Sequence, residues 1–265
     1  MRGRRAEPAK LDDRGAPLGG LAMRALTNIL RTYLTAVSVN KVMFWNEDGV
    51  GVVAINNGAE NFLDRDVLAQ MAAAISAANN DDGVSWIALT ATGYQFFSAG
   101  IPWESLDYSY ASVAEVLAAA KALFSVLLVS EKPVVAVLNG SAAGLGLALA
   151  LLSDFAIAPP DVYLCHPEGS ADLPLLAAAE AVLWRLPRHV AVELLTGSPL
   201  SAEDAARYGL VRLVDRKNLF GDAKALIRGL RMGKFVRRQL AEWARRGVES
   251  MDSALLVPLM PILAD

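Results

Sequence analysis

The sequence contains few of the residues on which metal centres and disulfide frameworks depend. Among its 265 residues there are one cysteine, Cys165, and two histidines. An intrachain disulfide is therefore excluded, and we expect no metal site built from several histidines. A chain with a single cysteine is typical of a reducing compartment, so we expect a cytoplasmic protein. The chain also has no large excess of charge of either sign, with 25 basic and 28 acidic residues. The formal net charge of −3 provides no field that would attract nucleic acid or a membrane surface, and we expect neither as a partner.

Apolar residues make up 54% of the chain and charged residues 20%, a balance typical of a globular protein with an ample core. The apolar segments predict strands on both sides of a turn at residues 46–49 and over residues 86–90, and helices over residues 64–79, 111–128 and 175–186. Strands that alternate with helices in this way indicate an α/β fold built from crossover units.

One stretch, residues 133–153, has no charged side chain and is long enough for a transmembrane helix. Gly140 and Gly144 even have the spacing of a helix-packing motif. However, Asn139-Gly140-Ser141 is a turn signal in the middle of the run. We therefore predict a buried strand over Val134–Val137, a glycine-rich turn, and a helix over residues 147–152.

A strand that leads through glycines into a helix leaves free backbone N–H groups at the start of that helix. Such donors suit an oxygen that gains negative charge during a reaction, so this turn is a candidate oxyanion hole. Gly140, Gly144 and Gly146 do not have the spacing of a dinucleotide-binding loop, and no phosphate-binding loop motif occurs. Close packing of strand and helix without any chemistry is the alternative.

Several motifs, in a fixed order over residues 41–214, resemble those of the crotonase superfamily, the enoyl-CoA hydratase/isomerase family. The motifs are Phe97-Ser98-Ala99-Gly100-Ile101, Asn139-Gly140 followed by Gly144-Leu145-Gly146, residues 154–158, His166-Pro167-Glu168, residues 185–188 and residues 193–197. The resemblance implies a crotonase-type ββα spiral over residues 41–214, with a short C-terminal helical region at 215–265. Residues 1–40 would be an N-terminal extension, flexible in part.

The resemblance also implies an active site. Glu168 would be the catalytic base, and the backbone N–H groups of Ile101 and Leu145 would form the oxyanion hole. The substrate-binding positions would be Ala99, Gly100, Trp103, Gly144, Ala148 and His166. The substrate would be a coenzyme A thioester, no metal or other cofactor is implied, and the protein would be a homotrimer or homohexamer.

The sequence departs from the family pattern at Ala148, where hydratases of the family carry a second glutamate. Isomerases of the family work with a single glutamate at the position of Glu168, so we predict an enoyl-CoA isomerase. Enoyl-CoA hydration, another lyase or hydrolase reaction on an acyl-CoA, and a non-catalytic acyl-CoA-binding or assembly subunit are the alternatives. The basic residue usual for the family near Asn56-Asn57-Gly58 is also missing, and the helix at 175–186 replaces a glycine-rich loop.

Five residues are weaker candidates for a role in the chemistry. Cys165 and His166 are adjacent on an expected strand, so their side chains would point to opposite faces and would not form a nucleophile–base pair. His166 could instead share a face with Glu168. We expect Glu104 to be an acidic residue at the start of a helix, where the helix dipole favours it, and Asp172 and Glu180 to be solvated acids.

Overall fold

The computed structural model describes residues 40–106, 109–169 and 176–229, together with residues 236 and 239. Nearly all of the expected N-terminal extension and most of the expected C-terminal region lie outside these residues, as does Asp172. The division of the chain at residues 40 and 214 therefore stays a prediction.

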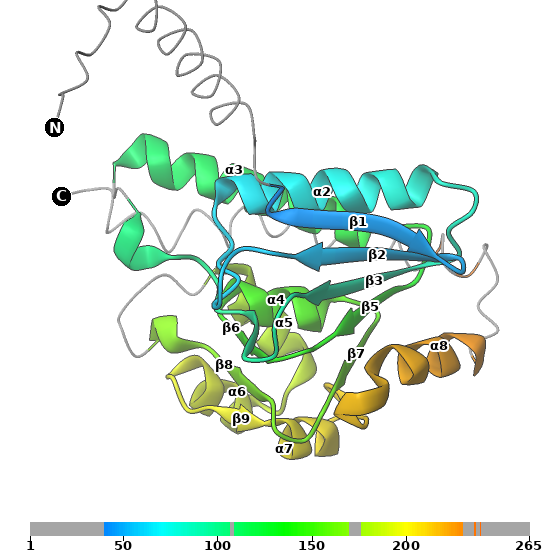
Figure 1. The fold of residues 1–265 in the computed structure, drawn as a ribbon. Coiled ribbons are helices and arrows are strands. Elements are labelled where there is room, and N and C mark those ends of the chain that lie inside the picture. Colours follow the sequence, from blue (N-terminus) through cyan, green and yellow to red (C-terminus); the bar gives the residue numbers. More distant parts are fainter. Residues whose placement is uncertain (1–39, 107–108, 170–175, 230–235, 237–238, 240–265) are drawn as a thin grey trace, which may run out of the picture. The chain divides into compact units, whose positions relative to one another are not determined.

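Six strands form the first sheet, in the order β1-β2-β3-β5-β7-β10 (Figure 1). β1 is antiparallel to β2, and the other neighbouring pairs are parallel. The strands are β1 (Val42–Glu47), β2 (Val50–Ile55), β3 (Trp86–Ala91), β5 (Val134–Val137), β7 (Phe155–Ala158) and β10 (Arg212–Leu213). The sequence predicts the first four of these strands, and the structure confirms them.

The second sheet has four short strands, in the order β4-β6-β8-β9. They are β4 (Phe96–Ser98), β6 (Ser141–Ala143), β8 (Tyr163–Cys165) and β9 (Leu200–Ser201). The expected turn after β5 is wrong in detail, because residues 141–143 form β6 between β4 and β8. The strand Ser-Ala-Ala is too short to show an alternating pattern, and its pairing with distant strands decides its conformation.

Helices α2 (Arg65–Asn80) and α3 (Tyr110–Leu128) lie side by side over one face of the first sheet (Figure 1). The expected helix at 147–152 begins earlier, as α4 (Leu145–Leu152). The other helices are α5 (Leu176–Arg185), α6 (Arg188–Leu195), α7 (Ala202–Arg207) and α8 (Leu219–Gly229), and the short 3₁₀ helices are η1 (Trp103–Ser105), η2 (Pro167–Gly169) and η3 (Arg216–Asn218).

The central strands are apolar except for Thr90, and their side chains pack in hydrophobic clusters on both faces of the sheet. Val53 and Leu89 belong to the larger core, which they share with residues of α2 and α3. Their neighbours Val52 and Ala88 face a second cluster that includes Ala223 of α8. A sheet that is buried on both sides requires continuous rather than alternating apolar sequence, as observed here.

The uncharged stretch at 133–153 forms β5, β6 and α4 and is not a single helix. In the described part of the chain, one helix segment, Ala111–Leu128 in α3, is long and apolar enough to cross a membrane, with a mean hydropathy of 1.8. Its residues Val113, Leu117 and Phe124 are buried in the core against α2. A core helix of a soluble protein has the same length and composition, so this observation is weak evidence for a membrane span.

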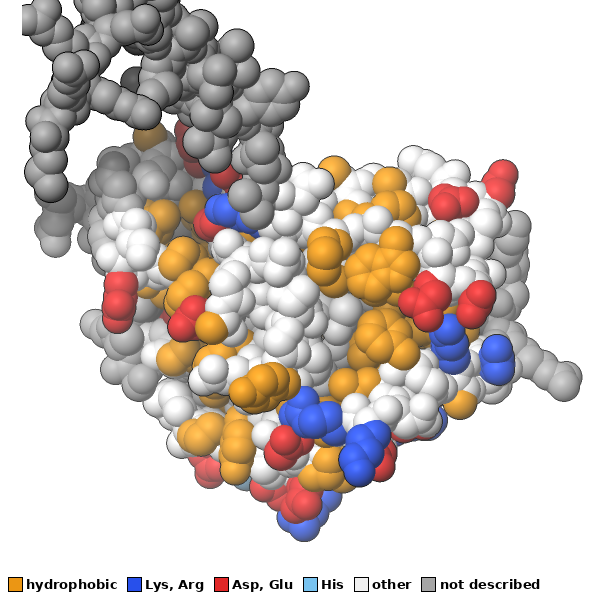
Figure 2. Space-filling view, in the orientation of Figure 1, with side chains coloured by type: hydrophobic (Ala, Val, Ile, Leu, Met, Phe, Trp, Pro, Cys, Tyr) orange, Lys and Arg blue, Asp and Glu red, His pale blue; other side chains and the backbone are white. Residues whose placement is uncertain are grey.

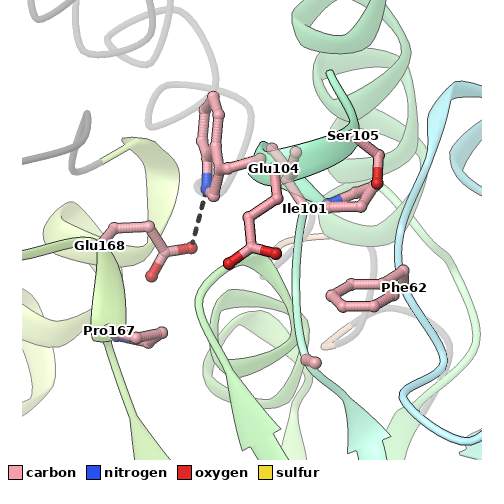
Figure 3. A pocket seen from close by; sticks show the side chains of 9 residues that line it. Phe62, Ile101, Glu104, Ser105, Pro167 and Glu168 are labelled. Atoms are coloured by element: carbon pink, nitrogen blue, oxygen red, sulfur yellow. Dashed lines mark hydrogen bonds between the residues drawn. The ribbon is translucent and has the colours of Figure 1, made fainter. Parts of the chain in front are cut away.

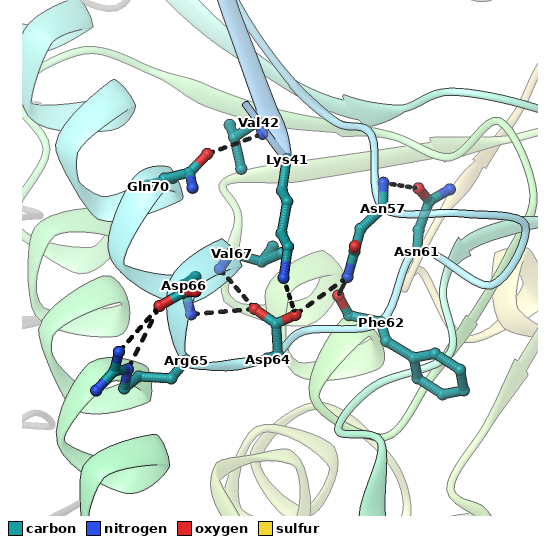
Figure 4. Close-up of polar contacts among 10 residues, drawn as sticks. All are labelled: Lys41, Val42, Asn57, Asn61, Phe62, Asp64, Arg65, Asp66, Val67 and Gln70. Carbon is teal, nitrogen blue, oxygen red and sulfur yellow. Dashed lines mark hydrogen bonds and ion pairs between the residues drawn. The ribbon is translucent and has the colours of Figure 1, made fainter. Parts of the chain in front are cut away.

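Asp64 joins the start of α2 to β1 and to the preceding loop (Figure 4). Its side chain accepts hydrogen bonds from the Asp66 and Val67 amides, as an N-cap does, and Lys41 Nζ lies 2.6 Å from its Oδ2. Burial alone would raise the pKa of Asp64, but the bonds from Lys41 and from the Val67 amide hold it below its usual value.

We expect Asp64→Ala to lower the free energy of unfolding at pH 7 by about 1–2 kcal/mol, because the variant loses a helix cap and leaves Lys41 unpaired. Chemical denaturation followed by circular dichroism measures the change. Asp82→Ala, in an exposed loop, is the control and should change stability by less than about 0.5 kcal/mol.

The effect of Asp64→Ala should also depend on pH. Because folding lowers the pKa of Asp64, its contribution to stability is present above the ordinary value of 3.8 and is lost as the pH falls through the lowered value. The difference between wild type and variant should therefore shrink at acid pH. A difference that stays constant from pH 7 to pH 2.5 would contradict this assignment.

Candidate active site

The first loop of the site follows β4 and is held by the segment that precedes α2. The Ala99 amide donates to the Glu60 carbonyl at 2.9 Å, and the Leu63 amide donates to the Gly100 carbonyl at 2.8 Å. Asn61, fully buried and with a φ of 49°, donates from Nδ2 to the carbonyl oxygens of Thr92 and Phe96. Backbone and side-chain bonds thus fix the path of residues 99–101.

The second element is the entry to α4, where Gly144 has a φ of 52° and a ψ of −119°. Gly100 of the first loop has a φ of 86° and packs directly against this entry. A Cβ built on Gly100 would lie 3.0 Å from the Ala143 carbonyl oxygen and 3.2 Å from the Leu145 nitrogen. The two glycine turns that precede Ile101 and Leu145 are therefore in contact.

The amides of Ile101 and Leu145 are the two predicted oxyanion donors. Among the described residues, neither amide nitrogen donates to a protein acceptor outside the regular helices and strands. Leu145 is the first residue of α4, where backbone N–H groups have no partner within the helix. Both side chains are apolar and largely buried, so the backbone amides are the polar donors that these two positions offer.

Glu168 reaches this place from η2, directly after β8. Its side chain is buried, with 4% of the residue exposed, and Trp103 Nε1 donates to Oε1 at 3.5 Å (Figure 3). A Cβ built on Gly144 would overlap Oε1 of Glu168, so the carboxylate rests against the bare Cα of Gly144. The predicted base and the entry to α4 are therefore in direct contact.

His166 lies beside Glu168, with its Nδ1 3.5 Å from Oε2. In the described part of the chain, these two atoms are the buried side-chain nitrogen and oxygen atoms that lack a hydrogen-bond partner. Burial lowers the pKa of His166 below its ordinary value of 6.5, although the charge of Glu168 acts in the opposite direction. The imidazole is therefore neutral at pH 7, and a tautomer protonated at Nδ1 presents a donor to Oε2.

Cys165 is only partly exposed, and burial, with the negative charge of Glu168, raises its pKa to about 11. A thiol of this kind is protonated at neutral pH and is a poor nucleophile. This supports the interpretation that Cys165 and His166 do not form a catalytic pair.

A cavity of about 310 Å³ opens in front of these groups (Figure 3). The structure brings four of the predicted site residues into its lining, namely Ala99, Ile101, Trp103 and Glu168. Gly144 and His166 do not line the cavity but lie next to Glu168, and the Leu145 amide lies next to Gly100, which precedes the lining residue Ile101. Ala148 is fully buried in the apolar core and does not line the cavity.

Other lining residues were not expected from the sequence, namely Phe62, Pro102, Glu104, Ser105 and Pro167. Glu104 is the second residue of η1 and was expected only as a helix-start acid. The sequence around Glu104 contains no signal that its carboxylate would enter the cavity, because the direction of a side chain on an isolated 3₁₀ turn is set by the packing around it.

Among the described residues, no three His, Cys, Asp or Glu side chains form a group that could hold a metal ion. What the site presents is a buried carboxylate, two free backbone donors and an apolar wall. This arrangement suits removal of a proton next to a carbonyl group whose oxygen becomes negative.

The sequence profile described as Enoyl-CoA hydratase/isomerase matches residues 46–255. A crotonyl-CoA hydratase of Syntrophomonas wolfei is 30% identical over 232 residues, which cover 83% of this chain and 88% of the relative. A short-chain-enoyl-CoA hydratase of Clostridium acetobutylicum is 29% identical over 231 residues, with 83% and 87% covered.

The fold has a solved counterpart in Pseudomonas aeruginosa DspI, with a TM-score of 0.72, 26% sequence identity, and 87% of this chain and 91% of that chain covered. This likeness confirms the predicted crotonase-type α/β fold. The two curated relatives named above are hydratases, so the comparisons support the hydratase alternative better than the isomerase prediction.

The contact between Gly144 and Glu168 can be tested with two glycine variants. Gly93 has a φ of 80° and no atom within 4 Å of an added Cβ, so Gly93→Ala should cost only backbone strain, about 1–2 kcal/mol. Gly144→Ala should cost at least about 1 kcal/mol more, because the new methyl group also displaces a buried carboxylate. Chemical denaturation measures the free energy of unfolding of both variants. An equal decrease in the two variants would contradict the contact between Gly144 and Glu168.

The protonation of His166 can be followed by NMR, since His189 is the only other histidine and His166→Gln identifies the signal. We expect the His166 imidazole to titrate below pH 6.5. Because folding lowers its pKa, its contribution to stability is full above 6.5 and decreases as the pH falls from 6.5 towards the lowered value. A midpoint above 6.5 would show that the charge of Glu168 outweighs burial.

Proposed function

Because the chain belongs to the enoyl-CoA hydratase/isomerase family of the crotonase superfamily, we propose that it moves a proton at the α-carbon of an acyl-CoA thioester. Glu168 is the base, and the amides of Ile101 and Leu145 bind the thioester oxygen. The observation that carries this proposal is the buried Glu168 carboxylate, with one unpartnered oxygen, at a cavity that Ile101 lines, while the Leu145 amide packs against Gly100, the residue before Ile101.

The proposed chemistry follows from the charges involved. Removal of the α-proton, or attack at the β-carbon of a 2-enoyl thioester, places negative charge on the thioester oxygen. Two preorganised N–H donors aimed at that oxygen stabilise the charge. A single carboxylate within reach of the α-carbon then suffices for the proton transfer. Neutral His166 is compatible with this role, because its Nδ1 lies 3.5 Å from Oε2 and places no positive charge beside the carboxylate.

We propose reversible hydration of a short-chain 2-enoyl-CoA as the reaction. Two facts support this choice. The relatives described above are named as hydratases of crotonyl-CoA and of short-chain enoyl-CoA. The cavity also contains a second carboxylate, Glu104, besides Glu168, and hydration requires that a water molecule be held as well as deprotonated.

Double-bond isomerisation is the second candidate, and Ala148 favours it. The position that carries a second glutamate in hydratases of the family has a methyl group here, and that methyl group is fully buried. A reaction that moves one proton between two carbons needs only Glu168. A non-catalytic acyl-CoA-binding subunit would retain the cavity but show no turnover.

The assembly and location of the protein are also proposals. By resemblance to the family, we propose a homotrimer or homohexamer that binds an acyl-CoA substrate, and the single cysteine supports a cytoplasmic location. Light scattering of the purified protein measures the oligomeric state, and a stable monomer would contradict the proposed trimer or hexamer.

Glu168→Gln keeps the size of the side chain but removes the base. We expect it to lower the rate of crotonyl-CoA hydration by about 100-fold or more, the usual scale for a positioned acid–base group. Isomerisation of a 3-enoyl-CoA, assayed on the same preparations, should fall equally if it occurs. Glu203→Gln, on the exposed surface of α7, is the control and should retain the wild-type rates.

Product analysis by chromatography distinguishes the candidates. A 3-hydroxyacyl-CoA product supports hydration, whereas a 2-enoyl product formed from a 3-enoyl substrate, without further hydration, supports isomerisation. Tight binding of the thioester without any product, unchanged in Glu168→Gln, would identify a binding subunit and overturn the enzymatic proposal.

A further inference from the structure

The cavity contains a second carboxylate that comes from an unexpected element. Among the described residues that line it, Glu104 and Glu168 are the two acidic residues. They come from different segments, Glu104 from η1 and Glu168 from η2. In Figure 3 the two carboxyl groups extend into the same space, with the Glu104 group between Glu168 and Ile101.

The two carboxylates differ in their surroundings. Glu168 is buried, with 4% of its surface exposed, and rests against Gly144 and Trp103. Glu104 lines the same cavity but is exposed to solvent. A buried carboxylate suits proton transfer to carbon, whereas a solvated one can accept a hydrogen bond from a water molecule entering from the solvent.

The position of Glu104 depends on the same short turn that provides two other parts of the site. The Trp103 amide donates to the Ile101 carbonyl at 2.9 Å, and the Ser105 amide donates to the Pro102 carbonyl at 3.0 Å. This turn therefore places the proposed oxyanion donor of Ile101, the indole that bonds Glu168, and the Glu104 carboxylate within four consecutive residues.

The usual place for a second acid cannot serve in this chain. Ala148 has no acidic group, its side chain is 0% exposed, and it packs in the apolar core. If the protein hydrates an enoyl thioester, the water must be held by another residue. Among the described residues that line the cavity, Glu104 is the acidic residue besides Glu168 that could hold this water.

We propose that Glu104 holds the attacking water during hydration, because the alanine at position 148 cannot do so. This inference rests on the proposed function. The Glu104 carboxylate accepts a hydrogen bond from one hydrogen of the water, and that hydrogen stays on the oxygen. The other hydrogen passes as a proton to Glu168 while the oxygen bonds to the β-carbon.

The step balances without any further reactant. As the C–O bond forms, the electrons of the carbon–carbon double bond move towards the thioester oxygen, which the Ile101 and Leu145 amides stabilise. The enolate then takes the proton from Glu168 at the α-carbon, and Glu168 is ionised again. The product is a 3-hydroxyacyl-CoA, and Glu104 is unchanged throughout.

The test separates hydration from proton transfer. Glu104→Gln and Glu104→Ala are assayed for crotonyl-CoA hydration and for exchange of the α-protons of butyryl-CoA in D₂O, which needs Glu168 and the amides but no attacking water. We expect Glu104→Ala to lower the kcat of hydration by about 100-fold, with KM and the exchange rate within about twofold of wild type. Glu104→Gln, which can hold water only through its amide oxygen, should lose less.

Two matched variants complete the experiment. Glu168→Gln should lose both hydration and exchange, and Glu203→Gln should lose neither. Hydration within about twofold of wild type in both Glu104 variants would overturn the role of Glu104 and leave the proposed function intact. Loss of exchange together with hydration would also overturn it, since Glu104 would then act on proton transfer and not on water.

The two activities of the wild-type protein also distinguish the role of Glu104 from the proposed proton transfer by Glu168. Exchange without hydration would overturn both the hydratase assignment and the role of Glu104, while leaving isomerisation by Glu168. Absence of both activities in a well-folded wild type would overturn the proposed function as a whole.

Discussion

The contact between the Glu168 carboxylate and the Cα of Gly144 is the constraint on which the site depends. It is possible only because residue 144 has no side chain, and the φ of 52° and ψ of −119° there favour glycine for a second reason. The Gly144 amide also donates to the Cys165 carbonyl at 3.1 Å, which ties the entry of α4 to the strand that leads to Glu168. Gly100 packs on the other side of this entry. One close backbone approach therefore sets the carboxylate and both free amides relative to each other.

The same packing leaves His166 Nδ1 and Glu168 Oε2 buried without hydrogen-bond partners, 3.5 Å apart. Leaving two such atoms unpaired costs on the order of 1–3 kcal/mol each, more for a charged group. A fold that retained them only for stability would replace them with apolar side chains. A carboxylate that acts on a substrate needs one oxygen that is not already bonded, and a neutral imidazole beside it limits the cost without neutralising its charge. The unpaired atoms are thus consistent with function and are difficult to explain by stability alone.

The sequence predicted the parts of the fold that local patterns specify. The strands β2, β3 and β5 are apolar runs that end at turn residues, and α2 begins at a capping aspartate, Asp64. It did not predict β6, which has three residues and is a strand only because β4 and β8 pair with it. The motif resemblance supplied Glu168, Ile101 and Leu145 as candidates. It could not supply Glu104, because the direction of that side chain depends on the packing of η1 against the cavity, and no spacing in the sequence records this.

The choice between hydration and isomerisation shows why one position is a weak basis for assigning a reaction. Ala148 argued for isomerisation because it removes an acid from α4. A reaction, however, depends on which groups reach the substrate, and a carboxylate can reach the same space from a different segment. In this chain α4 contributes apolar packing and, in the proposed site, the amide of Leu145, while η1 places the Glu104 carboxylate in the lining of the cavity. The absence of an acid at residue 148 therefore does not by itself decide against hydration, because Glu104 supplies a second carboxylate to the lining of the cavity.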